Sequence, residues 1–245
     1  AVLLEANTLT LGGTAATTYS GVMSGSGLLV KNGSSVFTVT GSNTFSGGVN
    51  LSAGAIEAGN DAAFGTGLVT FSGGRISSDS GTARAIANAF NLSGALTLGD
   101  GTNSGTLTLS GNAALSGNTT LTVASAATLS GIVSGTYNLV KDGGAELTLS
   151  GVNTFGGTTA VDGGMLTLSG GSALINSMAV TVGAGGSLRL ATSEEIGTLA
   201  GAGAVLLEGN TLTLGGSAAT TYSGVMRGSG LLVKNGAAVC KVTGS

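Results

Sequence analysis

The sequence has no proline, no tryptophan and no histidine, and its 245 residues include a single cysteine, Cys240. Without histidine there is no imidazole general base and no Cys–His pair for nucleophilic catalysis. One cysteine excludes an intramolecular disulfide and a metal site built from several thiolates. The lack of proline suits a chain made mostly of paired strands, because proline has no N–H to donate to a ladder.

Charged and aromatic residues are also scarce. They make up 8% and 4% of the chain, and 8 basic against 11 acidic residues give a net charge of −3. No basic cluster stands out, so we expect no nucleic-acid partner. No apolar run is long enough to cross a bilayer, so we expect no membrane insertion by this segment. What is abundant is glycine, with 47 residues, in a chain that is 42% hydrophobic. That composition suits short buried strands separated by tight corners.

Internal repeats organise the chain on two scales. Residues 25–60 align without a gap with residues 135–170 at an offset of 110, and a truncated third copy occupies residues 228–245 at a further offset of 93. Residues 1–42 recur as residues 204–245, so the long period is 203. We therefore predict one domain over residues 1–245 that is a repeat array.

A shorter rhythm of about 20 residues lies inside each copy, and it is the length of one coil of a β-solenoid. Strand-like runs alternate apolar and small polar residues, which places the apolar side chains on one face. We predict that four leucines face the core: Leu147, Leu149, Leu166 and Leu168. The alanine-rich run 83–90 could form a helical turn, but the spacing of its apolar residues favours an irregular edge or a strand.

The repeat unit resembles a known family. Both main copies read Leu-Val-Lys-(Asn/Asp)-Gly, a β-strand ending in Gly, Asn-Thr-Phe, and then a corner containing Gly. This pattern is similar to the passenger-associated repeat of bacterial autotransporters, and the resemblance extends over essentially the whole chain. It implies an all-β, right-handed parallel β-helix outside a Gram-negative cell, at the outer-membrane surface or beyond. Complete members also carry a signal peptide, a membrane barrel and an autochaperone-like cap, so we expect an excised piece or a stretch of a very long array.

The candidate site residues are assigned structural roles. Asn43 and Asn153 are expected at inward corners, where an amide can bond the coils above and below. Phe45 and Phe155 follow them and are expected in the core. Cys240 replaces Phe37 of the first copy, which predicts a buried, inert thiol.

Acidic residues offer few chemical sites. Asp142 and Asp162 could stack as a carboxylate pair, but Asp-Gly corners explain both. Glu194 and Glu195 are interpreted as a solvated loop, and residues 99–103 as a loop that lacks a calcium-binding repeat. We therefore predict no catalytic residue, no metal and no cofactor.

Lysines and threonines complete the list of candidates. Lys31, Lys141 and Lys234 recur before an Asn-Gly or Asp-Gly corner and are interpreted as exposed charges that discourage lateral strand pairing. Threonine pairs such as Thr106 and Thr108 do not repeat on every coil, so they do not form the flat array of an ice-binding solenoid.

These observations predict a structural protein rather than an enzyme. We expect a rigid stalk, spacer or fibre segment of a bacterial surface adhesin. The alternatives are a β-helix that binds glycans or host receptors and, less favoured by the scattered acids, a polysaccharide-degrading enzyme. The duplication of residues 1–42 also allows copies to stack end to end.

Overall fold

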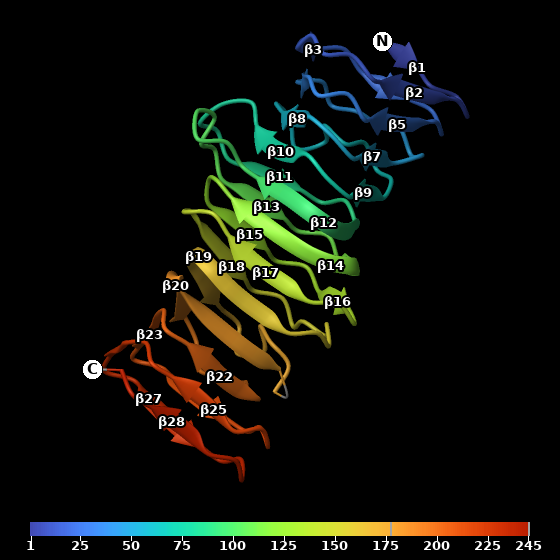
Figure 1. Cartoon of the computed structure of the whole chain (residues 1–245). Helices are drawn as coiled ribbons and strands as arrows, with labels where there is room; N and C mark the ends of the chain where they lie inside the picture. Colours follow the sequence, from blue (N-terminus) through green and yellow to red (C-terminus); the bar gives the residue numbers. More distant parts are fainter. Residues whose placement is uncertain (177, 245) are drawn as a thin grey trace.

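The computed structural model describes residues 1–176 and 178–244 and shows an all-β protein. Parallel strands stack about 20 residues apart and form a β-solenoid of about 12 turns. The two ends of the chain lie at opposite ends of the stack (Figure 1). The described residues contain no helix, so none is long and apolar enough to cross a membrane.

Each coil contributes strands or strand-like segments to three columns that run the length of the solenoid. The first column contains β2 (Thr8–Leu11), β5 (Leu28–Lys31), β7 (Val49–Leu51), β9 (Val69–Phe71), the first parts of β12 (Phe90–Leu98) and β14 (Ala113–Val123), β16 (Val133–Gly135), β21 (Glu194–Ile196), β24 (Thr211–Leu214) and β27 (Leu231–Lys234).

The second column contains β3 (Thr17–Tyr19), β6 (Val36–Val39), β8 (Ala55–Ala58), β10 (Arg75–Ser78), the last parts of β12 and β14, β17 (Leu139–Asp142), the first parts of β19 (Thr159–Leu168) and β20 (Ala179–Leu190), β22 (Thr198–Gly201), β25 (Thr220–Tyr222) and β28 (Cys240–Val242).

The third column contains β1 (Val2–Leu3), β4 (Met23–Ser24), β11 (Arg84–Ile86), β13 (Leu107–Leu109), β15 (Ala127–Leu129), β18 (Glu146–Leu149), the last parts of β19 and β20, β23 (Ala204–Glu208) and β26 (Met226–Gly228).

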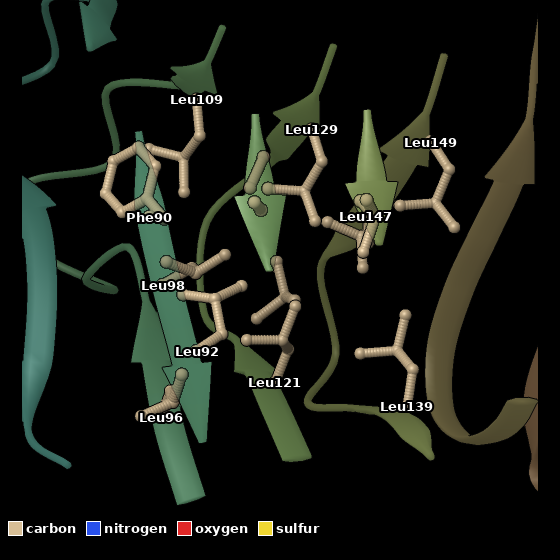
Figure 2. Packing of buried hydrophobic residues seen from close by; sticks show 14 of the residues in the cluster. Phe90, Leu92, Leu96, Leu98, Leu109, Leu121, Leu129, Leu139, Leu147 and Leu149 are labelled. Carbon is tan, nitrogen blue, oxygen red and sulfur yellow. The ribbon is translucent and has the colours of Figure 1, made fainter. Parts of the chain in front are cut away.

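Alternation within each strand builds one continuous core. Leu147 pairs in register with Leu166, and Leu149 with Leu168, and all four side chains are buried. Thr148 between them is half-buried on the outer side. Figure 2 shows the leucines of successive coils turned toward one another in the interior. Stacked coils therefore share one core, as a solenoid requires for stability.

The run 83–90 adopts the extended alternative. β11 covers residues 84–86, and β12 begins at Phe90. Ile86, Phe90 and Leu92 are buried, so this segment continues the inward-facing pattern of its neighbours.

One glycine marks the same place in all three copies. Gly25, Gly135 and Gly228 have φ angles of 97°, 111° and 104°. A Cβ atom at any of them would lie under 3.0 Å from the backbone of the preceding coil. Glycine is therefore required by backbone conformation and by the close approach of two coils.

The two main copies place equivalent residues on different columns. Leu29 of the first copy lies in the first column, whereas its equivalent, Leu139, lies in the second. The offset between these copies therefore corresponds to five coils and one further column. The offset from the second copy to the third corresponds to four coils and two columns, so Leu232 is again in the first column. The full long period is ten complete coils, and the two main copies face different sides of the solenoid.

Candidate functional site

Asparagine corners replace strand pairing where a column has no strand. Residues 43–45 and 62–64 bridge β4 to β11 in the third column, and residues 153–155 and 172–174 bridge β16 to β21 in the first. Phe45 and Phe155 are fully buried beside these corners.

Each corner asparagine uses both ends of its amide. Asn43 Oδ1 accepts the Met23 N–H at 2.8 Å from the coil before, and Asn43 Nδ2 donates to the Ala63 carbonyl at 2.7 Å in the coil after. Asn153 repeats this arrangement with the Val133 N–H at 2.7 Å and the Ala173 carbonyl at 2.8 Å. Both side chains are buried, so each amide satisfies backbone groups that no water reaches.

Polar side chains of the following coil also form hydrogen bonds to the main chain around these asparagine corners. Asn88 Nδ2 donates to the carbonyl of Gly67 at 2.7 Å below the first turn. Below the second turn, Glu194 accepts the Leu174 N–H at 2.9 Å and the Ala173 N–H at 3.3 Å. Burial raises the pKa of the Glu194 carboxyl, and the two N–H groups oppose that rise.

The prediction of a solvated Glu194–Glu195 loop is therefore wrong. The pair begins β21, and the Glu194 side chain is buried in the first column, in register with Leu212. Adjacent acids suggested solvent, but the turn above presents N–H groups to this position, and a carboxylate supplies the acceptors that they need.

The prediction that the recurring lysines are exposed is wrong for Lys31 and Lys141. Both are fully buried at inward positions, two residues after Leu29 and Leu139. The aliphatic stem lies in the core while the ammonium reaches a corner. The signal was present in the sequence, since each lysine has the parity of the preceding inward leucine.

Backbone carbonyls surround each buried ammonium. Lys141 Nζ donates to the carbonyls of Gly143 at 2.7 Å, Gly163 at 2.8 Å and Asp142 at 3.0 Å. Three acceptors match the three N–H donors of an ammonium. Burial lowers the pKa of Lys141 to about 8, and the neighbouring Asp142 charge opposes this shift.

Lys31 makes a similar arrangement in the first copy. Its Nζ donates to the Gly33 carbonyl and, at 3.4 Å, to the Ala53 carbonyl of the next coil. Gly54 has a φ angle of +69°, and a Cβ atom there would collide with the ammonium. Burial lowers the pKa of Lys31 as well.

A loop after β12 forms a separate ionic cluster on the surface. Residues 99–103 form the predicted loop, and Asn103 Nδ2 reaches back to Glu57 Oε1 at 3.3 Å, two coils earlier. Arg75 lies between them, 3.2 Å from Glu57 and in contact with Asp100. Ser77 is fully buried in this region, and its hydroxyl has no hydrogen-bond partner among the described residues.

The remaining candidate residues do not come together as a catalytic or metal-binding group in the described part of the chain. Asp142 ends β17 and Asp162 lies within β19, and residues 1–176 and 178–244 contain no group of three or more potential metal ligands. Cys240 is half-buried against the core in register with Thr220. The outward-facing residues Thr108, Thr128 and Thr148 are paired in register on consecutive coils and form one row.

Shallow hollows lie beside the two turns. One of about 410 Å³ contains Asp61, Thr66 and Asn88. Another of about 400 Å³ is lined by uncharged residues: Thr136, Asn138, Gly156, Gly157, Thr158, Ile175, Met178 and Ala179. Because equivalent residues of the two copies lie in neighbouring columns, these hollows face different sides of the solenoid.

Comparison with known proteins identifies the repeat. The family model described as Passenger-associated-transport-repeat matches residues 29–58 and 139–168. Two copies of the passenger-associated-transport repeat are therefore present in this chain, and they support an autotransporter passenger segment. Each matched copy contains one buried lysine, one corner asparagine and a buried phenylalanine two residues after that asparagine, so these features recur with the repeat.

A curated relative is similar over about half of the chain. It is the "Adhesin BmaC autotransporter" of Brucella suis biovar 1 (strain 1330), with 39% identity over 129 residues. The match covers 49% of this chain and 4% of the relative, so the chain spans a small part of the relative's length. No solved structure matches the chain.

Proposed function

We propose that this passenger segment is a rigid, non-enzymatic stalk or spacer in an adhesin at the surface of a Gram-negative cell. The observation that carries the proposal is the unbroken stack of about 12 turns with one continuous core. At about 4.8 Å per coil, the stack is roughly 55 Å long. The adhesin name of the relative supports an adhesive passenger.

The repeat arithmetic provides a direct test. A second copy of residues 43–245, added after residue 245, extends the array by one long period, or ten coils, without changing the column of any later residue. The stack should lengthen by roughly 48 Å. As part of a surface-displayed passenger, the longer segment should hold an adhesive tip farther from the cell and restore attachment across a thick surface layer.

A matched variant separates spacing from recognition. Deleting residues 32–141 joins Lys31 to Asp142, so that equivalent parts of two copies meet. It removes five coils and turns every later residue by one column. If the segment is a spacer, the distance that it spans should shrink in proportion to the number of coils removed. The rotation of later residues by one column should have no effect on attachment. Attachment that depends on which column the later residues occupy, and not on the number of coils, would contradict the stalk proposal.

A second candidate function is glycan or receptor binding. The uncharged hollow at Thr136, Asn138 and Thr158 favours it, because hydroxyl and amide groups there are open to a neutral ligand. Glycan-array binding that Asn138→Ala abolishes, in a variant that folds like wild type, would support this function over a pure spacer. End-to-end association of copies stays a prediction, and sedimentation velocity over a range of concentrations tests it.

A further inference from the structure

Apolar alternation alone leaves the stacking register of a repeat nearly undetermined. In the first copy, Leu29 pairs with Val49 and Lys31 with Leu51. A slip of two residues would pair Leu29 with Leu51, which is equally apolar and keeps every side chain on its own face. In the second copy, Leu139 pairs with Thr159, and the same slip would give it Val161 instead. Hydrophobic burial therefore does not favour the observed register.

The buried lysine distinguishes the two registers. Lys141 donates to Gly163 and Lys31 to Ala53, and in both copies the acceptor carbonyl lies 22 residues after the lysine, in the next coil. A slip of two residues moves that carbonyl by about 6.6 Å along the strand, beyond hydrogen-bonding reach. The ammonium would then be buried with one donor unmatched, which is the arrangement that a protein interior tolerates least.

The third copy repeats the contact between the lysine and its own corner. Lys234 pairs in register with Leu214, and its Nζ donates to the Gly236 carbonyl of its own corner. The contact between the ammonium and its own corner is therefore common to all three copies.

We propose that Lys31 and Lys141 set the stacking register of the passenger-associated-transport repeats. Each ammonium binds the carbonyl of its own corner first, and the following coil completes the set of carbonyls only when its corner arrives in the native register. The role is positioning, and it explains why a charge stands at positions whose ladder neighbours are apolar: Leu11 and Leu51 for Lys31, and Leu121 and Val161 for Lys141.

Disulfide trapping during refolding measures the register directly. In a Cys240→Ser background, the outward pair Val140→Cys/Ala160→Cys reports the native register, because Val140 and Ala160 are neighbours in the ladder. The pair Val140→Cys/Asp162→Cys reports the slipped one. Paired parallel residues are close enough for a disulfide, and residues two positions away are not.

The comparison is between chains with Lys141 and with Lys141→Met, which keeps the stem and removes the ammonium. With Lys141, the slipped disulfide should form roughly tenfold less than the native one, the factor expected from one hydrogen bond to a buried charge. Lys141→Met should remove most of that preference. Lys234→Met is the matched control and should leave the ratio unchanged, since its ammonium binds its own corner and lies outside the second copy.

Two results would overturn the proposal. One is an unchanged ratio in a Lys141→Met chain that refolds. The other is the absence of both disulfides and of folded protein, which would make the ammonium a requirement for stability instead of register. The first copy supplies an independent measurement with Lys31→Met, in which Val30 is paired with Asn50 for the native register and with Ser52 for the slipped one.

Discussion

Replacing the corner asparagine by its acid isolates one hydrogen bond. In Asn153→Asp, one carboxylate oxygen can still accept the Val133 N–H, which lies 2.7 Å from the amide oxygen of wild type. The other oxygen takes the place of Nδ2, which lies 2.8 Å from the Ala173 carbonyl. The variant therefore changes a donor into a second acceptor at a buried position and leaves the shape unchanged.

The expected loss of stability follows from those two changes. A buried charge without compensation costs about 3–5 kcal/mol, and this includes the carbonyl that loses its donor. Asn138→Asp is the matched control: its Oδ1 also accepts an N–H, that of Thr158 at 2.8 Å, but the side chain is exposed. A carboxylate there keeps the acceptor in water, so we expect a change of about 0.5 kcal/mol or less.

The loss should also depend on pH. The carboxyl group introduced at position 153 should have a folded-state pKa above the unfolded value of about 3.9, because burial and the facing carbonyl disfavour its charged form. The folded variant then binds more protons than the unfolded chain between these two pKa values, so its stability falls as pH rises through that window. At pH 4 the protonated acid can donate to Ala173, and the deficit should shrink.

Urea denaturation of wild type, Asn153→Asp and Asn138→Asp at pH 4 and pH 7 gives the required free energies of unfolding. Amide exchange at Val133 and Ala173 localises the effect. Equal losses in the two variants would refute the reasoning, as would an Asn153→Asp deficit that is the same at both pH values.

Three further predictions concern the core, a lysine and the surface loop. Leu149→Ala should cost about 2–5 kcal/mol of unfolding free energy, whereas Thr148→Ala should change it by about 0.5 kcal/mol or less; equal losses in urea denaturation would contradict the inward and outward assignments. The folded-state pKa of Lys141 is about 8, below the unfolded value near 10.4, so the unfolded chain binds more protons between them and stability should rise with pH there, by about 1–3 kcal/mol relative to Lys141→Met. A flat difference between pH 7.5 and pH 10 would count against that shift. Arg75→Gln should speed amide exchange in the loop of residues 99–103 about fivefold, since a partly exposed ion pair contributes roughly 1 kcal/mol. Added salt should speed the exchange in wild type as well; exchange that is insensitive to both would mean that other contacts hold the loop.

Much of the architecture was predictable because the repeat exposes its own pattern. The alternation around Leu147 and Leu149 indicates the inward face, and the spacing of about 20 residues indicates the coil. The ambiguous run 83–90 was resolved in favour of strands by the parity of Ile86. These features follow from the local periodicity of side-chain types, which can be read from a single sequence.

The errors concern charged residues that have at least one partner in another coil. The sequence predicts an exposed charge at Lys141 and a solvated loop at Glu194, whereas both side chains are buried. Their partners include carbonyl and N–H groups of the main chain one coil away, and main-chain groups leave no mark in a sequence. For Lys141, a charged residue with inward parity beside a glycine corner is the pattern that could have identified it.

The sequence by itself determined the coil length, the long period and the inward identity of the leucines, because each is a periodicity of side-chain type. Only the tertiary structure decided where each copy faces. The sequence offset between two copies does not tell which column the later copy occupies until the length of each coil is known. The loops after β10 and β12 make some coils longer than their neighbours. Five coils lead from Leu29 to Val133 within the first column, and Leu139, six residues further on, already lies in the second. Lys31 and Lys141 therefore lie on different sides of one core.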